Sequence, residues 1–201
     1  MPSDSVGRQG GPAFASGESL HRAADADGLP QVTRLAAYGL VVRDGRILVC
    51  HISPGSAGAG LWMLPGGGLV FGEPPELGAV REVEEETGLV AEITGPAMVH
   101  SDSGIWERSA GDVRFHHVRF VYPMRIAGGE ERVEVDGSTD GFDWVPLDRV
   151  RGLPLGDLVS RVLDDLDRVR GVRGVGGVGG VGGVGGVGGV GGVGEAGGGS
   201  A

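Results

Sequence analysis

The chain has 201 residues and a formal net charge of −10 at pH 7. This length suffices for one domain with a hydrophobic core, and the negative charge disfavours a protein that binds nucleic-acid polymers, because such proteins usually carry a basic stripe. Cys50 is the only cysteine, so an intrachain disulfide is excluded. We find no secretory signal and no apolar segment long enough to cross a bilayer, and therefore expect a cytoplasmic protein without a membrane partner.

Composition divides the chain into three segments. Residues 1–31 are rich in Ser, Gly, Ala and Asp and lack an apolar period, which predicts a disordered N-terminal tail. Residues 32–170 carry strand and helix patterns and are the expected domain. Residues 171–201 are mainly Val-Gly-Gly repeats, whose side chains are too few to offset the entropy of ordering. We expect a flexible tail there, with an interaction tail as the alternative.

The first elements of the domain are strand-like. The runs 35–42 and 46–52 are joined by Asp44-Gly45, a dipeptide typical of a type I′ hairpin turn. A polar loop is predicted at 102–112. Further strand patterns lie at 61–64, 91–101, 113–122 and 142–145.

Two helices are expected among these strands. The first lies between Pro74 and Gly88, because proline suits the first helical turn and glycine suits the residue that follows the last turn. The second covers 155–169, where apolar residues recur at helical spacing. Strands together with two helices predict a mixed sheet with helices packed on it.

The first helix carries a cluster of carboxylates. Glu82, Glu85 and Glu86 fall within an arc of roughly 100° on one helix face. Arg81 precedes Glu85 by four residues and can hold its carboxylate by a charge-assisted hydrogen bond. A solvated acidic face is one interpretation of this pattern. The other is a site for Mg²⁺, which takes oxygen ligands and keeps waters that a phosphate can replace.

The residues around this cluster carry a resemblance to a known family. They match the Nudix box, G-x5-E-x7-R-E-U-x-E-E-x-G-U with U aliphatic, at every fixed position. The matching residues are Gly67, Glu73, Arg81, Glu82, Val83, Glu85, Glu86, Gly88 and Leu89. The chain therefore resembles Nudix hydrolases, and the resemblance implies an α/β/α sandwich with a mixed central sheet in which the box forms a loop, a helix and a loop.

The resemblance also implies an activity and site residues. Family members typically hydrolyse a nucleoside diphosphate linked to another moiety, with Mg²⁺ as the cofactor here and Mn²⁺ as the alternative. The Glu82, Glu85 and Glu86 carboxylates and the Gly67 carbonyl are the candidate metal ligands. The candidate catalytic residues are Glu85, Glu86 and Arg81.

Several further roles stay open. Arg81 and Glu73 are expected to fix the helix and the preceding loop. The general base comes from Glu85 or Glu86 on the helix, or from Glu107 or Asp112 in the predicted loop. Residues that can contact substrate are Trp62, Phe71 and His116, with Trp106, Phe115 and His117 as neighbouring candidates. For each of these side chains, packing in the core is the alternative role.

Family markers narrow the substrate only by elimination. The proline expected about fifteen residues after the box in ADP-ribose hydrolases is replaced near Gly104, and the markers for dinucleoside polyphosphates and coenzyme A are missing. A MutT-like (d)NTP pyrophosphohydrolase remains, acting on a phosphorylated small molecule as a monomer or a homodimer. The alternative function is a non-catalytic Nudix module that senses nucleotides or binds a partner.

Overall fold

The computed structural model describes residues 18–21, 28–107, 111–135 and 137–175. The chain divides into two units after Asp164. The predicted tails, 1–31 and 171–201, lie largely outside the described residues. Among the described residues, no helix combines the length and the apolar character that a membrane span requires.

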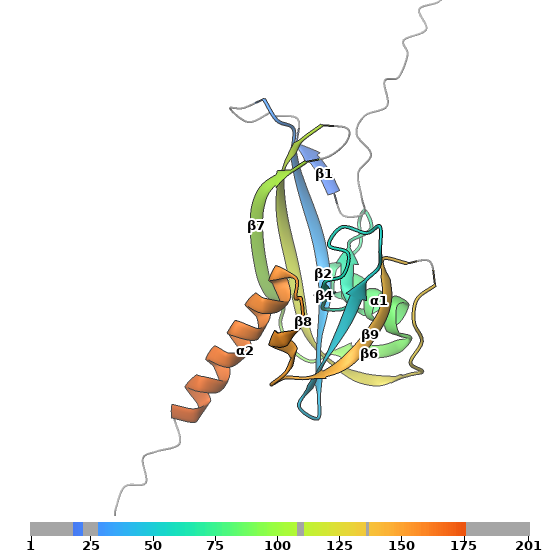
Figure 1. Cartoon of the computed structure of the whole chain (residues 1–201), viewed down its shortest axis with the longest axis vertical. Helices are drawn as coiled ribbons and strands as arrows, with labels where there is room; N and C mark the ends of the chain where they lie inside the picture. Colours follow the sequence, from blue (N-terminus) through green and yellow to red (C-terminus); the bar gives the residue numbers. More distant parts are fainter. Residues whose placement is uncertain (1–17, 22–27, 108–110, 136, 176–201) are drawn as a thin grey trace, which may run out of the picture. The chain divides into compact units, whose positions relative to one another are not determined.

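Nine strands of the described residues form one sheet (Figure 1). They are β1 (Glu18–His21), β2 (Gln31–Arg43), β3 (Arg46–Ile52), β4 (Trp62–Met63), β5 (Gly66–Gly68), β6 (Leu89–Ile93), β7 (Met98–Trp106), β8 (Val113–Gly129) and β9 (Thr139–Pro146). The central order is β4-β3-β2-β8-β6, and β1, β5, β7 and β9 pair with β2, β2, β8 and β3. Since β2 and β8 are parallel and the other pairs antiparallel, the predicted mixed sheet is confirmed.

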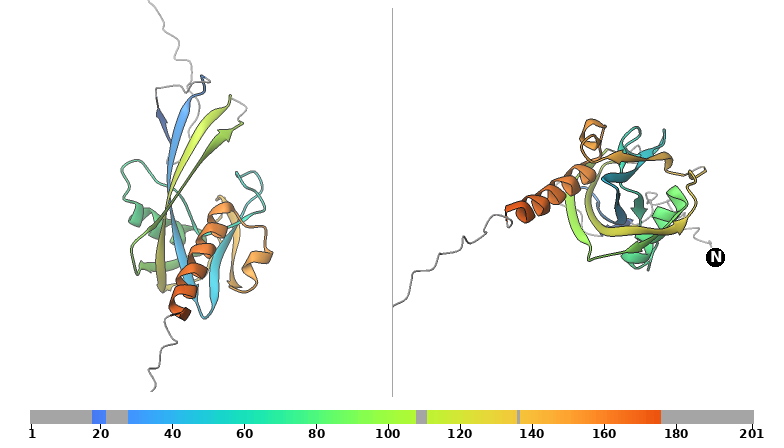
Figure 2. Two further views of the ribbon diagram at one scale, coloured as in Figure 1. Left: turned by 90° about the vertical axis from the view of Figure 1, so that its left-hand side faces the viewer. Right: turned by 90° about the horizontal axis from the view of Figure 1, so that it is seen from below.

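The long strand β2 is the centre of this sheet. It pairs with β1, β3, β5 and β8, and β8 pairs in turn with β7; Figure 2 shows these long strands from two further sides. Its hairpin with β3 is the predicted one: Asp44 and Gly45 have φ of 50° and 72°, as a type I′ turn requires. Side chains on one face of β2 and β8 can therefore meet although they are far apart in the sequence.

Two strand segments differ from the sequence-based expectation. The loop predicted at 102–112 is wrong for residues 102–106, where β7 continues and pairs with β8 as far as Trp106 opposite Val113. Residues 18–21, in the segment predicted as a tail, form β1 and pair with 31–34. In both cases the hydrogen bonds come from a distant partner strand, which local composition does not reveal.

Helix α1 (Pro75–Thr87) is the predicted first helix. Gly88 follows it at φ 72° and donates its N–H to the Glu84 carbonyl at 2.8 Å, as expected for a left-handed C-terminal cap. The helix packs on the sheet through a cluster of buried apolar side chains that includes Val83 and Leu69. A Cβ on Gly39 of β2 would lie 2.6 Å from Val83 Cγ2, so only glycine allows this close approach.

The remaining helices follow β9. A 3₁₀ turn, η1 (Val150–Gly152), leads to α2 (Asp157–Val175), which begins in the first unit and continues into the second. The buried face of its first turns consists of Leu158, Val159, Val162 and Leu163, matching the helical period of the sequence. The predicted start at 155 is two residues early, because Leu155 forms a bridge to Trp62 of β4.

Candidate active site

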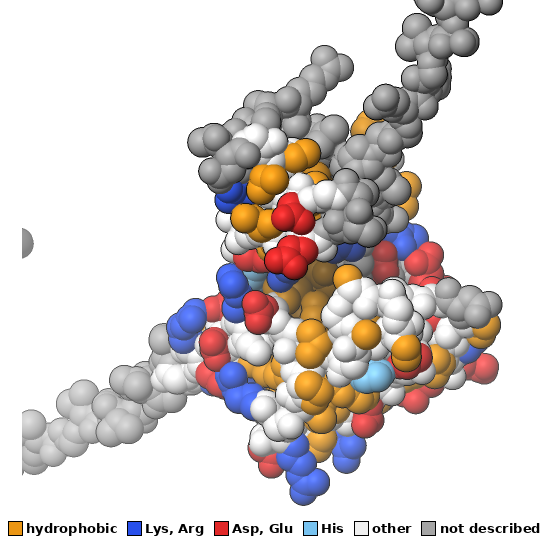
Figure 3. Space-filling model, turned by 45° about the horizontal axis from the view of Figure 1, so that its top comes forward, with side chains coloured by type: hydrophobic (Ala, Val, Ile, Leu, Met, Phe, Trp, Pro, Cys, Tyr) orange, Lys and Arg blue, Asp and Glu red, His pale blue; other side chains and the backbone are white. Residues whose placement is uncertain are grey.

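A cavity of about 920 Å³ lies beside the start of β5 and the last turn of α1. Its wall includes Gly66, Gly67 and Glu86 from the motif, and Arg34, His117 and Arg119 from β2 and β8. The face shown in Figure 3 is hollowed, with hydrophobic side chains in the hollow and acidic and basic side chains interspersed around it. A cavity of this size accommodates a small molecule.

Glu86 is a buried carboxyl group at the wall of this cavity. Its residue is 3% exposed, and Oε2 accepts the Gly66 N–H at 3.0 Å. The pKa of Glu86 is raised to about 8, mainly by burial and also by the nearby Glu82, whereas the bonds from Gly66 and from the Cys50 thiol oppose the rise. A carboxyl group in this environment lacks compensating positive charge.

The backbone that meets Glu86 requires glycine. Gly66 has φ 150°, and a Cβ there would lie 2.4 Å from the Ala37 carbonyl oxygen. The glycine segment pairs with β2, with Gly66 opposite Tyr38 and Gly67 opposite Ala37. The glycine segment is therefore a short strand that places a backbone donor against Glu86.

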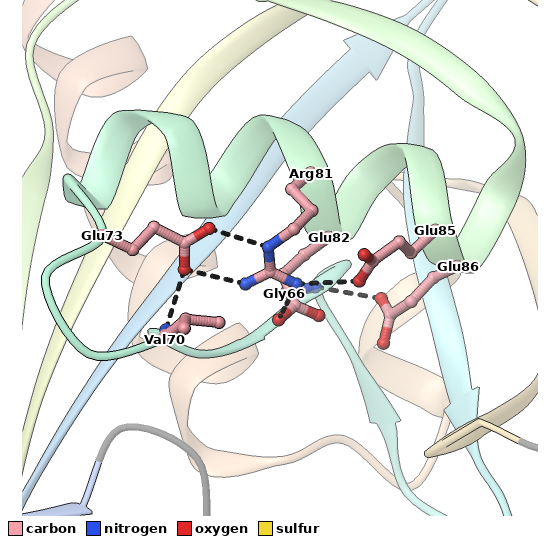
Figure 4. A network of polar contacts seen from close by, with 7 residues as sticks. All are labelled: Gly66, Val70, Glu73, Arg81, Glu82, Glu85 and Glu86. Atoms are coloured by element: carbon pink, nitrogen blue, oxygen red, sulfur yellow. Dashed lines mark hydrogen bonds and ion pairs between the residues drawn. The ribbon is translucent and has the colours of Figure 1, made fainter.

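Arg81 joins three carboxylates into one network (Figure 4). Its Nε and Nη2 donate to the two oxygens of Glu73 at 2.7 and 2.9 Å. Its Nη1 donates to Glu82 at 2.9 Å and to Glu85 at 2.7 Å, so the expected Arg81–Glu85 bond is present. Glu73 also accepts the Val70 N–H at 2.9 Å, and the bond from Arg81 is the main cause of its lowered pKa. Arg81 thus ties the helix to the preceding loop.

We tested whether these residues fit a divalent cation. Burial is the main cause of a raised pKa at Glu82, as at Glu86, so both carboxyl groups would gain from added positive charge. A Cβ on Gly67 would lie 2.9 Å from both Glu82 oxygens, so the missing side chain leaves space beside that carboxylate. Carboxylate and carbonyl oxygens are the donors that Mg²⁺ prefers. The donor set therefore fits the ion.

The arrangement differs in one respect from the predicted single acidic face. Within the described part of the chain, no three His, Cys, Asp or Glu side chains are grouped closely enough to hold a metal ion. The reason is that Arg81 holds Glu82 and Glu85, while Glu86 bonds to Gly66. A cation that takes Glu85 as a ligand must compete with Arg81 for it.

Of the residues suggested for substrate contact, Trp106 and His117 line the large cavity, whereas Trp62, Phe71 and His116 lie apart from it. Trp62 is half-buried and tilts on His51 with ring centroids 5.1 Å apart, and Phe71 is fully exposed. His116 lines a second, smaller cavity of about 330 Å³ and bonds to Ser101 at 3.3 Å. Of the two loop candidates for the base, Glu107 lines the large cavity and Asp112 does not.

Sequence reasoning named His117 as a candidate for substrate contact but missed the polar group around it, at the other end of the large cavity. Arg34, Asp102, His117 and Arg119, which we call the far cluster, come from β2, β7 and β8 and meet through strand register. Arg119 Nη2 lies 2.6 Å from His117 Nδ1 and 3.2 Å from Asp102 Oδ1. Burial lowers the pKa of His117 to about 4, with Arg119 and Arg34 lowering it further and Asp102 opposing them. The only sequence feature that could have indicated the far cluster was the alternation of charged residues along β8.

Comparison with known proteins places this geometry in context. Residues 32–164 match the family model described as NUDIX domain. The chain is 32% identical over 139 residues to a MutT-like protein of Streptomyces ambofaciens, covering 69% of this chain and 80% of that protein. It is 31% identical over 108 residues to an ADP-ribose pyrophosphatase of Methanocaldococcus jannaschii, covering 54% of this chain and 60% of that protein.

A solved structure agrees with the family match. The crystal structure of a MutT NUDIX hydrolase from Burkholderia pseudomallei superimposes with a TM-score of 0.53 at 31% identity, covering 66% of this chain and 96% of that one. Fold, motif geometry and relatives point to the same family.

Proposed function

The chain belongs to the NUDIX family of hydrolases, which act on acid anhydrides in phosphorus-containing compounds, and from this premise we propose that it cleaves a pyrophosphate bond in a nucleoside diphosphate linked to another moiety. The proposed cofactor is Mg²⁺, with Mn²⁺ as the alternative ion. Within this class we propose a MutT-like (d)NTP pyrophosphohydrolase. The Streptomyces and Burkholderia relatives, both described as MutT proteins, support that choice.

One observation carries the proposal: Glu86, buried and with its pKa raised to about 8, lines a cavity large enough for a nucleotide. A buried acid that has no positively charged partner and lies in the wall of a cavity is suited to a cation and to the phosphates that a cation binds. A carboxylate with a purely structural role would be expected to have all of its hydrogen bonds satisfied within the protein.

Each residue of the motif has a role in this proposal. Glu82 and Glu86 would hold the ion, and Glu85 and the Gly67 carbonyl would be its further ligands from the protein. The ion, when bound, neutralises charge on the phosphates and makes an attacking water more acidic. Arg81 and Glu73 fix the helix against the loop, so that the ligands keep their spacing.

The proton of the attacking water goes to a carboxylate of α1. Glu107 lines the cavity but follows the end of β7, where Trp106 is opposite Val113 of β8. Gly66 lies opposite Tyr38, which is opposite Val121, eight residues further along β8. Eight residues at about 3.3 Å each place Glu107 roughly 26 Å along the strand from the metal ligands. Glu85 and Glu86 therefore remain the candidates for the base.

The second candidate function is a module that binds nucleotides without turnover. The observation in its favour is that Arg81 engages both Glu82 and Glu85 in ion pairs, which reduces the carboxylates open to a cation. It predicts nucleotide binding that is independent of Mg²⁺.

A single panel experiment separates the two functions. The full chain is incubated with the dNTPs, ADP-ribose, nucleotide sugars and dinucleoside polyphosphates, with Mg²⁺ or with chelator, and products are identified by chromatography. We expect Mg²⁺-dependent release of pyrophosphate from at least one dNTP. Turnover of ADP-ribose alone would move the assignment toward the Methanocaldococcus relative, and the absence of any turnover would contradict the proposed enzyme.

A further inference from the structure

The far cluster stands at a distance from the proposed metal ligands that suits the non-reacting part of a nucleotide. Arg34 lies opposite His117, and Tyr38, four residues along β2, lies opposite Gly66. At about 3.3 Å per residue, the two ends of the cavity are roughly 13 Å apart. Sugar and phosphates fit between them, so the group at the far cluster is the base.

Contacts within the far cluster fix the tautomer of His117. Arg119 Nη2 lies 2.6 Å from His117 Nδ1, and a guanidinium can only donate, so Nδ1 must accept. The low pKa of His117, about 4, keeps the ring neutral at pH 7. Asp102 Oδ2 is further from Nδ1, at 3.4 Å, and accepts from Arg119 as well. The single ring proton is therefore assigned to Nε2.

This Nε2–H group is a buried donor without a partner. His117 is 8% exposed, and its Nε2 has no hydrogen-bond partner among the described residues. Leaving a buried donor unpaired is unfavourable, so such a group in a cavity wall suggests that a ligand supplies the acceptor. The Trp106 ring lies tilted against His117 with centroids 4.9 Å apart, and its movement would open the Nε2 edge to the cavity.

The group that His117 offers to a ligand is an uncharged donor. Arg119 is held by the carboxylate of Asp102 at 3.2 Å, and the low pKa of His117 keeps its ring neutral. A phosphate binds most strongly to charged donors, so the Nε2–H group suits a neutral acceptor. A planar group that presents a hydrogen-bond acceptor matches both the donor and the adjacent aromatic ring.

We propose that His117 determines base specificity, its Nε2–H donating to the keto oxygen of the base of a nucleotide substrate while Trp106 moves aside to stack on that base. Arg119 and Asp102 position the ring. The inference rests on the proposed function, since it takes a nucleotide as the ligand. Keto bases present an acceptor oxygen to the Nε2–H group. Adenine and cytosine present an amino group at the same position, so one donor would face another.

The test compares ITP with ATP, whose bases differ only in the edge at positions 1 and 6. In the wild type we expect kcat/KM to favour ITP by roughly tenfold or more, the discrimination typical of a base-edge hydrogen bond. His117→Phe keeps a ring but removes the donor, and should bring the ratio close to one by lowering the ITP value. His51→Phe is the matched control, because His51 also contacts an aspartate, Asp140 at 2.6 Å, but lies outside the cavity wall. It should leave the ratio unchanged.

Two measurements keep the inference testable without turnover. Dissociation constants of the α,β-methylene analogues of ITP and ATP should show the same preference in the wild type and its loss in His117→Phe. Nitrogen NMR shifts should show the proton of His117 on Nε2. If His117→Phe does not fold, His117→Gln, which retains a donor, is compared instead with His117→Leu.

The outcomes separate this inference from the proposed function. Preferential binding of the ITP analogue without hydrolysis of either nucleotide would contradict the enzyme and support the role of His117. The role of His117 would be overturned if the wild type treated the two nucleotides equally, or if the variants without a donor kept the wild-type preference. It would also be overturned if neither analogue bound, or if the ring proton were on Nδ1.

Discussion

The two ends of the cavity differ in the charge of the groups that they offer to a ligand. At the α1 end, burial raises the pKa of Glu82 and Glu86, so these carboxyl groups have too little positive charge near them. In the far cluster, burial is the main cause of the lowered pKa of His117, so its ring stays an uncharged donor. The first environment favours a cation, and the second favours a neutral acceptor.

This difference shows how one cavity can bind a polar ligand in a fixed direction. Phosphates are drawn to the end where a cation would sit, and a base with an acceptor edge is drawn to the other end. Variants and pH changes that alter the groups at one end of the cavity should therefore change its function in a predictable way.

The largest effect is expected from Glu86→Gln. Removing the charge at the α1 end should lower kcat of the Mg²⁺-dependent reaction by at least about a hundredfold, as loss of a charge-stabilising group does in other enzymes. Steady-state kinetics with Mg²⁺ titration measures this. Because glutamine resembles the protonated carboxyl group, the metal-free variant should melt no lower than the wild type.

Its matched control is Glu84→Gln, an exposed glutamate on the same helix. This variant should retain wild-type kcat. A large loss in Glu84→Gln, or normal turnover in Glu86→Gln, would contradict the role of Glu86.

A smaller loss is expected from Arg81→Lys. Lysine keeps the charge but cannot donate at once to Glu73, Glu82 and Glu85 from a planar fork. Mg²⁺ affinity or activity should fall by about 10–100-fold, the range for residues that orient metal ligands. Calorimetric Mg²⁺ titration is the measurement, with Arg125→Lys, an exposed pair with Glu92, as the control. Unchanged affinity in Arg81→Lys would show that orientation by Arg81 is unimportant.

In the metal-free protein, Glu86 and His117 should change the unfolding free energy in opposite directions as the pH rises. The folded protein holds a proton on Glu86 from its ordinary pKa of 4.5 up to about 8, so the unfolding free energy falls as pH rises through this window. The unfolded chain holds a proton on His117 between about 4 and its ordinary 6.5, so His117 makes stability rise with pH there. From pH 6.5 to 8 only the fall should remain.

Thermal unfolding in chelator across pH 4 to 9 tests this sign. Glu86→Gln should remove the fall above pH 6.5, and His117→Phe should leave the fall due to Glu86 unopposed between pH 4.5 and 6.5. A melting temperature that increases from pH 6.5 to 8 in the wild type would refute the assignment at Glu86.

The smallest effect is expected from Cys50→Ala. The Cys50 thiol bonds to the Glu86 carboxylate and lowers its pKa. Losing one weak donor should reduce kcat/KM roughly two- to tenfold, the size of a single neutral hydrogen bond. Cys50→Ser restores a donor and should recover most of the activity at pH 7. Equal activity in the alanine and serine variants would show that the hydrogen bond from Cys50 to Glu86 does not affect catalysis.

The α1 end was predictable from sequence because its residues lie within 23 positions of one another, from Gly67 to Leu89. Helical periodicity and the two end residues were enough to place Glu82, Glu85, Glu86 and Arg81 together. The sequence could not show that Arg81 would take up two of the carboxylates. That outcome depends on side-chain conformations rather than on spacing.

The far cluster was not predictable in the same way. Arg34, Asp102 and His117 come from three strands, and only the register of β2, β7 and β8 brings them together. Asp102 was even assigned to a loop, since it begins the polar run Asp102-Ser103-Gly104 and its partner strand is distant in sequence. His116 and His117 alternate across β8, and sequence alone did not decide which of them would line the cavity.

The close approach at Gly39 has a consequence for how such an enzyme can be retuned. A methyl group on Gly39 would lie 2.6 Å from Val83 Cγ2 and 3.0 Å from Met124 Sδ, so α1 approaches the sheet closely at this point. Gly39→Ala should therefore raise the whole helix and move its acidic side chains as a rigid set, and Val83→Ala should lower it again. A pair of apolar positions that touch neither ion nor nucleotide can thus adjust the reach of the carboxylates without altering any of them.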